Sequence, residues 1–275
     1  MTRTVKTNNN ILVPIDFSEI AMDALDHAVV MAKKYNNEIT LLHIEDDTKK
    51  AESRMEEMKD KIEKENGVTV HTLYKTGKVH QVIAQVAEVG NYDSIMMGSN
   101  GASGFQRFMG SNASKVIKSV HLPVIVIKEK ANFESYDKIV MPIDLSVESK
   151  QKVEWACHVA KKYNSTVHVI YEEEQDEYFQ KNIVANINQV SRILDEAGVK
   201  HELKKMLDKH YPGKLYKDTL QYAEQIDADL ILIMSQLESS FFDLGIGSHA
   251  QFIVNTAKTA VMVIQPSETG FLFDY

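Results

Sequence analysis

Short apolar runs alternate along the chain with longer segments in which apolar residues recur every three or four positions. The first run covers residues 11–15, and the segment after it places one helical face on Ala21, Leu25, Ala28, Ala32 and Tyr35. The same alternation predicts strands at 11–15, 38–44, 68–74, 94–97 and 124–127, with helices at 19–35, 46–66, 79–89 and 111–120. Strands that alternate with helices predict a parallel sheet with right-handed crossovers and helices on both faces.

The sequence also predicts how exposed one of these helices is and where another begins. The helix at 46–66 is heavily charged, yet its apolar residues keep helical spacing, at Ala51, Met55, Met58 and Ile62. This predicts a half-exposed helix rather than a disordered tract. Ser18 precedes the first helix and is predicted to cap it, because its hydroxyl can accept a hydrogen bond from the first turn.

The pattern then starts again in the second half of the chain. Residues 139–146 (Ile-Val-Met-Pro-Ile-Asp-Leu-Ser) copy residues 11–18 at an offset of 128, and residues 160–164 copy residues 32–36 at the same offset. Near the end, Gly247-Ser248 matches Gly110-Ser111 at an offset of 137. The chain is therefore a tandem repeat.

The repeat predicts two α/β domains, each a doubly wound, Rossmann-like unit, at residues 1–130 and 137–275. Each would end its sheet with an apolar strand, at residues 124–127 and 261–264. A last strand is an edge with unpaired backbone groups, and both runs are too apolar to face water. We therefore expect the two strands to pair and to relate the halves by a pseudo-two-fold axis.

The C-terminal tail, residues 270–275 (Gly-Phe-Leu-Phe-Asp-Tyr), is rich in large apolar and aromatic side chains. Such side chains gain about 1.5 to 3 kcal/mol each when they are fully buried. We expect the tail to dock, either on its own chain or on a second copy, which leaves a homodimer open.

A glycine-rich stretch follows the predicted strand at 94–97. It contains Gly98, Gly101 and Gly104, and Gly110-Ser111 then opens a helix. Glycines let a ligand approach the main chain closely, and a helix N-terminus offers unpaired N–H groups and the positive end of a dipole. The stretch therefore favours phosphate binding, although a loop that needs glycine only to turn would show a similar pattern.

Composition limits the function classes. The chain has 275 residues, 44% of them hydrophobic and 25% charged, and a net charge of -8, which argues against nucleic-acid binding. The N-terminus has no apolar signal-like core and no run of about 18 apolar residues occurs, so we expect a cytoplasmic protein without membrane contact. The single cysteine, Cys157, lies on an apolar helix face and is expected to be a buried structural thiol.

The sequence resembles the universal stress proteins, a family within the adenine-nucleotide-binding α-hydrolase-like superfamily, over essentially its whole length. The matching motifs are Val-Pro-Ile-Asp-Phe-Ser at 13–18, Thr-Gly-Lys at 76–78, Met-Gly-Ser-Asn-Gly at 97–101, and Gly110-Ser111. The resemblance implies a five-stranded parallel sheet of order 3-2-1-4-5 in each half. It also implies a bound adenine nucleotide, ATP or a related one, with or without Mg²⁺.

The resemblance further implies a set of binding residues. Main chain after the second strand would face the adenine, the Asp after the first strand would lie beside the ribose or phosphates, and the glycines and helix start would follow the phosphates. The residues so implied are Asp16, Leu42, His43, Gly98, Gly101, Gly110, Ser111 and Asn112. Ligands of doubly wound sheets bind at this position, where the strand order reverses.

Two departures from the family pattern bear on the ligand. Eight residues separate Gly101 from Gly110, whereas the ATP-binding pattern has nine, so the choice between ATP and another adenine nucleotide stays open. In the second half an offset of 137 places Ser235 and Glu238 at the positions of Gly98 and Gly101. A carboxylate about 4 Å from one phosphate charge costs about 1 kcal/mol even in water. Unless Glu238 points into solvent, we expect one nucleotide per chain, in the first half.

Other chemistry is less well supported by the sequence. The 10 histidines show no recognised metal-ligand spacing, and His43 could equally be a packing residue at a strand end. Ser18, His43 and Asp16 could form a hydrolytic set, but no Gly-x-Ser-x-Gly elbow is present. A Walker lysine is also missing. The sequence therefore favours a nucleotide-binding stress-response protein with slow ATP hydrolysis at most, or an interaction scaffold that does not depend on nucleotide.

Overall fold

The computed structural model describes residues 3–5, 9–45, 49–99, 111–128, 133–145, 148–173, 176–206, 215–235, 248–266 and 271–273. The first half contains β2 (Asn10–Pro14), α1 (Glu19–Tyr35), β3 (Glu38–Ile44), α2 (Lys49–Asn66), β4 (Val70–Lys75), α3 (Val79–Val89), β5 (Ser94–Gly98), α4 (Ser111–Ser119) and β6 (Val124–Ile127). The predicted elements are confirmed, with their ends shifted by at most three residues.

The second half repeats this order. It contains β7 (Lys138–Pro142), α5 (Glu148–Tyr163), β8 (Thr166–Glu172), α6 (Glu177–Glu196), β9 (His201–Met206), α7 (Leu215–Gln225), β10 (Leu230–Met234), α8 (Ser248–Thr256) and β11 (Ala260–Ile264). Two short strands, β1 (Arg3–Val5) and β12 (Phe271–Phe273), lie near the chain ends.

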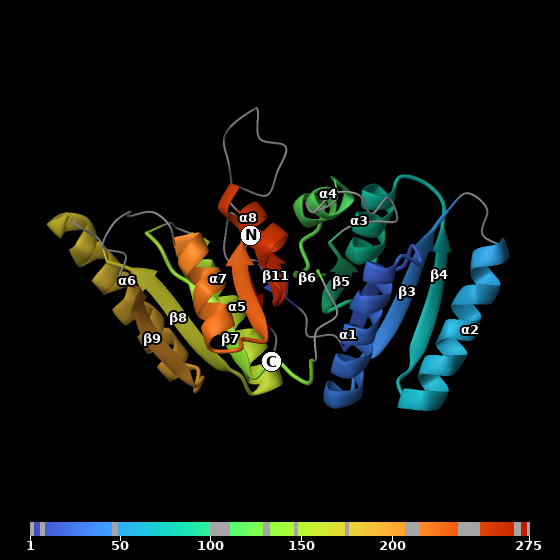
Figure 1. The fold of residues 1–275 in the computed structure, drawn as a ribbon, viewed down its shortest axis with the longest axis horizontal. Helices are drawn as coiled ribbons and strands as arrows, with labels where there is room; N and C mark the ends of the chain where they lie inside the picture. Colours follow the sequence, from blue (N-terminus) through green and yellow to red (C-terminus); the bar gives the residue numbers. More distant parts are fainter. Residues whose placement is uncertain are drawn as a thin grey trace.

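One ten-stranded sheet runs through both halves in the order β4-β3-β2-β5-β6-β11-β10-β7-β8-β9. Within each half all strands are parallel, and the order is 3-2-1-4-5 when the five strands are numbered along the chain. Figure 1 shows the two halves side by side, with β6 and β11 between them. The predicted fold class is therefore confirmed.

The halves join edge to edge through β6 and β11. These strands pair antiparallel, and Ile125 lies opposite Met262, its own counterpart in the repeat. Across the same junction Tyr35 packs edge-on against its counterpart Tyr163, with 4.6 Å between the ring centres. Contacts between equivalent residues place a pseudo-two-fold axis between them, as predicted.

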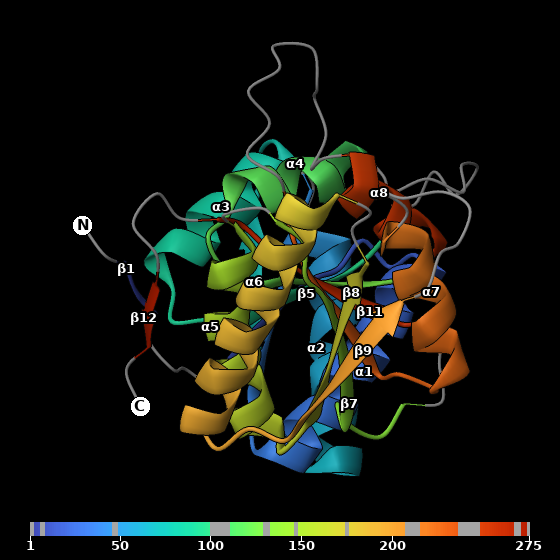
Figure 2. The same ribbon diagram turned by 90° about the vertical axis from the view of Figure 1, so that its left-hand side faces the viewer.

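The sheet divides the apolar core into two layers that both run across the junction. Alternate strand residues such as Ile11 and Val13 pack with α1, α2, α5 and α6, whereas Leu12 and Ile95 pack with α3, α4, α7 and α8. Successive strand residues point to opposite faces, so strands covered on both faces must be apolar throughout. Figure 2 shows the helices on either side of the strands in a view turned by 90°.

Two side chains that follow the junction strands reach into the opposite half. The Lys128 ammonium, after β6, donates to the Asn255 carbonyl at the end of α8. The Gln265 side chain, after β11, donates to the Ile117 carbonyl near the end of α4 (2.7 Å). The last carbonyls of a helix lack intrahelical partners. Each half therefore completes a helix end in the other.

The C-terminal tail docks on the N-terminal segment of its own chain. β12 pairs in parallel with β1, with Leu272 opposite Thr4. The expected docking is thus realised within the chain, by backbone pairing between its two ends. The C-terminal residues 274 and 275 lie outside the described part.

Two further expectations concern single features. Cys157 is buried, and burial raises the pKa of its thiol, as fits a structural residue. Among the described helices, none is both long and apolar enough to cross a membrane.

Candidate functional site

The carboxyl ends of β2 and β5 meet where the strand order of the first half reverses. β2 pairs in parallel with β3 on one side and with β5 on the other. Ile15, just after β2, donates its N–H to the Leu42 carbonyl (2.8 Å). The Leu42 side chain is fully buried in the core, so this position offers only main chain to the strand ends. Ligands of doubly wound sheets bind in the crevice at such a point.

Asp16 occupies a tight turn at this edge. Its Oδ1 accepts hydrogen bonds from the backbone N–H of Ser18 (3.0 Å) and from the Ser18 hydroxyl (2.5 Å). The Ser18 Oγ in turn accepts from the Ala21 N–H (3.3 Å), which confirms Ser18 as the cap of α1. Asp16 is exposed, so the turn holds a carboxylate in a fixed position just after the end of β2.

Phe17 lies between these two residues in a conformation that bulky side chains rarely adopt. Its φ is 60°, in the left-handed region. The Arg54 guanidinium of α2 stacks over the Phe17 ring, 4.1 Å from its centre. The Phe17 ring also contacts the His43 ring, with 4.9 Å between the two ring centres and an angle of 40° between the ring planes. Phe17 and Arg54 were not predicted as site residues. The only signal for this contact in the sequence was the aromatic residue Phe17 inside the motif at 13–18.

His43 is buried and is held at both ring nitrogens. Nδ1 lies 2.7 Å from the Ile15 carbonyl, and Nε2 lies 3.1 Å from the Glu45 carboxylate. Both partners are hydrogen-bond acceptors. The two contacts fix the His43 ring between the Ile15 carbonyl, just after β2, and the Glu45 side chain.

Gly98 ends β5 directly against the first turn of α1. A Cβ at this position would lie 2.9 Å from the Ile20 carbonyl oxygen and 2.9 Å from two carbons of its side chain. Real Cβ atoms do not come so close to backbone, so glycine is needed here for packing as well as for any approach by a ligand. This packing also fixes the end of β5 relative to the Asp16 turn.

The remaining predicted site residues are less fully described. Ser111 begins α4, and Asn112 beside it is exposed. Gly101 and Gly110 lie outside the described residues. In a doubly wound fold the helix that follows a strand begins at the carboxyl edge of the sheet. Asp16, His43 and Gly98 thus lie at the carboxyl ends of adjacent strands, and α4 starts at this same edge of the sheet.

The second half corrects one expected equivalence. Gly98 pairs with Ile127, whereas Met234 pairs with Ile264, the counterpart of Ile127. Met234 is therefore the counterpart of Gly98, and the match of Gly98 with Ser235 was wrong by one residue. The repeat offset is 136 at β5 and β10 but 137 at β6 and β11, because the loop between them is one residue longer in the second half. Glu238 lies outside the described residues.

The second half also carries a buried ammonium at its strand end. Lys152 of α5 is 7% exposed and donates to the Pro142 carbonyl at the end of β7 (2.6 Å). At an offset of 128 its counterpart in α1 is Ala24, which is fully buried. The two switch points therefore share an aspartate, Asp16 or Asp144, but differ in the side chains that surround the strand ends.

The described groups do not assemble a hydrolytic set from Ser18, His43 and Asp16. The Ser18 hydroxyl donates to Asp16 and accepts from the α1 backbone, while both His43 nitrogens face Ile15 and Glu45. Within the described ranges, no group of three or more His, Cys, Asp or Glu side chains is placed to hold a metal. The described groups at these strand ends are main chain and the Asp16 carboxylate.

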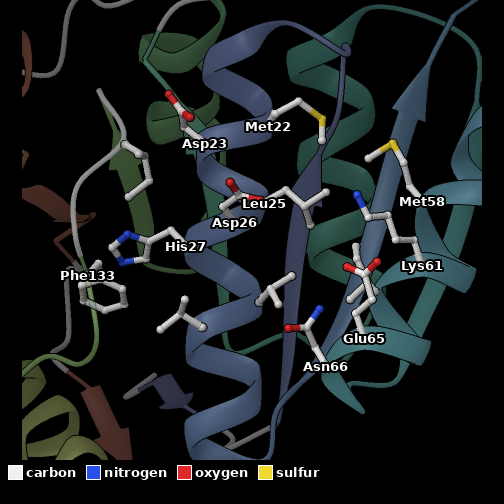
Figure 3. Close-up of a pocket in the computed structure, with 14 residues that line it drawn as sticks. Met22, Asp23, Leu25, Asp26, His27, Met58, Lys61, Glu65, Asn66 and Phe133 are labelled. Atoms are coloured by element: carbon white, nitrogen blue, oxygen red, sulfur yellow. The ribbon is translucent and has the colours of Figure 1, made fainter.

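A separate cavity of about 460 Å³ lies along α1 and α2 (Figure 3). Its lining includes none of Asp16, His43, Gly98 or Asn112. The cavity is therefore separate from these predicted site residues.

The fold is a tandem pair of doubly wound α/β domains joined in one sheet. The model of the universal stress protein family matches residues 7–128 and again residues 135–265. The chain therefore belongs to the universal stress protein family.

Known proteins are similar to the whole chain or to one half. Universal stress protein MJ0531 of Methanocaldococcus jannaschii is 29% identical over 139 residues, which are 43% of this chain and 81% of that protein. A solved universal stress protein from Archaeoglobus fulgidus covers 94% of this chain and 97% of its own, with a TM-score of 0.73 and 22% identity. Another from Archaeoglobus fulgidus, solved in complex with dAMP, covers 47% of this chain and 98% of its own, with 18% identity and a TM-score of 0.38.

Proposed function

We propose that this protein binds one adenine nucleotide, ATP or a close relative, at the switch point of its first domain and acts as a regulatory or protective binding protein. The first domain would comprise residues 1–130 and the second residues 137–275. The proposal rests on this chain's own residues. The observation that carries it is the switch point between β2 and β5, where the Asp16 carboxylate is fixed and exposed.

The chemistry of the crevice fits a ribose and phosphates. A fixed carboxylate accepts hydrogen bonds from ribose hydroxyls, and a helix N-terminus such as that of α4 attracts phosphate through its free N–H groups and dipole. Main chain at the end of β3, rather than the Leu42 side chain, would meet the base. Mg²⁺, if it accompanies the nucleotide, would reduce the repulsion between the phosphates and Asp16.

The second domain supports a single site per chain. Met234 stands where the first domain has Gly98, and Lys152 is buried at the end of β7 where the first domain has Ala24. These larger side chains would leave less room for a ligand beside the strand ends of the second domain.

A matched pair of variants tests the proposal. Asp16→Asn and Asp144→Asn make the same change at equivalent positions of the two domains. If the nucleotide binds the first switch point, Asp16→Asn weakens ATP binding at least tenfold and Asp144→Asn leaves it unchanged, as measured by isothermal titration. Ser111→Ala and Ser248→Ala provide a second matched pair at the starts of α4 and α8. Equal effects within each pair would contradict the assignment.

One observation favours a second candidate function. The glycine loop is one residue shorter than the family's ATP-binding pattern, with eight residues between Gly101 and Gly110. A nucleotide-independent interaction scaffold would tolerate this change. In that case purified protein carries no adenine nucleotide and titration with ATP and ADP gives no heat.

A further inference from the structure

Phe17, in the turn between β2 and α1, has a backbone conformation that a bulky side chain rarely adopts. The described non-glycine residues with a positive φ are Phe17, Asn36, Asn164 and Asp227, and φ is 60° at Phe17. Asparagine and aspartate tolerate this region, because their short polar side chains can hydrogen-bond to the nearby backbone. A phenylalanine lacks that compensation, and strain of this kind persists only where surrounding contacts hold it. Other parts of the fold must therefore hold Phe17 in place.

Two elements beyond the turn contact the Phe17 ring. Arg54 of α2 places its guanidinium 4.1 Å from the ring centre, and the centre of the His43 ring, from β3, lies 4.9 Å from it. His43 is buried and is itself fixed between the Ile15 carbonyl (2.7 Å) and the Glu45 carboxylate (3.1 Å). Phe17 also packs against the core layer that includes residues of α1 and α2. The middle residue of the turn is thus held by α2 and β3 together.

Arg54 contacts Phe17 and takes part in no ion pair among the described residues. Its side chain is exposed, and each ion pair that the described part of the chain forms joins other residues. A guanidinium stacks on an aromatic face through its planar surface and through the attraction between its charge and the ring. Replacing Arg54 by an apolar residue of similar length therefore removes this stacking and breaks no described ion pair.

The conformation of Phe17 helps to set the position of the Asp16 carboxylate. Asp16 Oδ1 accepts hydrogen bonds from the N–H (3.0 Å) and the hydroxyl (2.5 Å) of Ser18, the residue after Phe17. Because peptide units are planar, the direction of the Ser18 N–H depends on the backbone dihedrals of the turn, including those of Phe17. Ser18 also caps α1 through the Ala21 N–H (3.3 Å). A change at Phe17 would therefore release the carboxylate from Ser18 and disturb the start of α1.

The second half lacks the residues that form this contact. At an offset of 128 Leu145 stands in place of Phe17, and it is not among the described residues with positive φ. The only arginine of residues 137–275 is Arg192, which lies near the end of α6, whereas Arg54 lies near the start of α2. Arg192 is paired with Glu196 (3.7 Å). Within the described ranges, a ring held under a guanidinium directly after the aspartate therefore occurs in the first half only.

We propose that Phe17 and Arg54 are positioning residues of the first switch point: the Arg54 guanidinium holds Phe17 in its left-handed conformation, and Phe17 holds the Asp16–Ser18 turn in the form that binds ligand. The effect on binding rests on the proposed nucleotide site, whereas the turn itself exists without a nucleotide. A site that is already fixed loses little conformational freedom when its ligand binds. Loosening the turn should therefore weaken binding even though Asp16 is unchanged.

Isothermal titration of the full chain with ATP tests whether Arg54 acts through Phe17. Arg54→Met removes the guanidinium but keeps an unbranched side chain, and it should weaken binding at least about threefold, which a cation–π contact can supply. Phe17→Leu imports the residue of the second half and should weaken binding by as much or more. The double variant Phe17→Leu/Arg54→Met should bind no more weakly than Phe17→Leu alone, because Arg54 then has no ring to hold. The control Arg192→Met removes an exposed arginine from α6 and should bind as the parent does.

The exchange rate of the Ser18 amide tests the positioning role without nucleotide. This N–H donates to Asp16 Oδ1, so NMR should show faster exchange with solvent in Arg54→Met and in Phe17→Leu than in the parent. Arg192→Met should leave the rate unchanged. A role in stability alone would instead speed exchange along the whole of α1 and lower the free energy of unfolding in urea.

Three results would overturn the proposal. They are an unchanged Ser18 exchange rate in Arg54→Met and Phe17→Leu, additive losses of ATP affinity in the double variant, and equal weakening of binding by Arg192→Met. Additive losses would mean that Arg54 contacts the ligand directly. If the parent binds no ATP, the nucleotide proposal fails, and the Ser18 exchange rate alone decides whether Phe17 and Arg54 hold the turn.

Discussion

Lys162 of α5 and Asp93, the residue before β5, form an ion pair that ties the second half of the chain to the first. Their side chains are 15% and 9% exposed. The repeat would place a second such pair between Lys34 and Asp229, but Lys34 is exposed and Asp229 accepts instead from the Lys138 N–H (2.8 Å). The junction is therefore asymmetric in its charges although it is symmetric in its backbone.

This asymmetry predicts unequal effects of one substitution at two equivalent positions. Lys162→Ala leaves the Asp93 carboxylate buried without its partner, which costs about 3–5 kcal/mol for a buried pair. Lys34→Ala removes an exposed ammonium and should change stability by less than about 0.5 kcal/mol. Urea unfolding of the two variants measures the difference. A Lys162→Ala protein as stable as Lys34→Ala would show that the pair contributes nothing.

Acid should destabilise the protein partly through His27. Its pKa is lowered from 6.5 to about 3 by burial, so the unfolded chain takes up a proton below about pH 6.5 that the folded chain takes up only near pH 3. The unfolded state then binds more protons, and folding loses about 1.4 kcal/mol per pH unit across that interval. This part of the stability is fully present above about pH 6.5.

The variant His27→Gln isolates this contribution. It should lose part of the parent's decline in unfolding free energy between pH 6.5 and 4.5, with the remaining decline coming in part from His158 and His168, whose pKa values burial also lowers. His71 is exposed, and His71→Gln serves as the control. Identical pH profiles for parent and His27→Gln would refute the assignment.

The paired chain ends predict equivalent effects of two deletions. Removing residues 270–275 takes away β12, and removing residues 1–6 takes away β1, so either deletion breaks the same pairing. Each should lower the melting temperature by at least roughly 2 °C, the shift that about 1 kcal/mol produces in a domain of this size or somewhat smaller. Removing both should cost less than the sum, because the pairing between β1 and β12 can be lost only once. Additive losses would mean that the ends dock elsewhere.

The pattern of apolar residues was enough to predict the parallel sheet and its central junction, whereas the strand order came from the resemblance to the universal stress proteins. Residues 124–127 and 261–264 are apolar at every position, and a strand of that kind at a sheet edge must be covered. The pairing of Ile125 with Met262 follows from that requirement and from the repeat. Local periodicity and the need to bury edges are properties that a sequence carries directly.

The features that the sequence did not reveal depend on contacts between distant residues. The stacking of Arg54 on Phe17 joins α2 to the β2 turn, and the burial of Lys152 depends on the Pro142 carbonyl. The equivalence of Gly98 and Met234 required the strand register, because a one-residue difference in loop length is invisible when only the later strands are aligned. The cavity along α1 and α2 depends on how two amphipathic helices are spaced across the sheet.

The central claim is one adenine nucleotide per chain, bound by the first domain. Isothermal titration of the parent with ATP, with and without Mg²⁺, measures this most directly, with Gly101→Glu as the variant that adds a side chain and a negative charge to the glycine loop. The account predicts a stoichiometry near one and a loss of at least tenfold in affinity for Gly101→Glu, equivalent to about 1.4 kcal/mol. A stoichiometry near two, or binding by Gly101→Glu as tight as that of the parent, would contradict it.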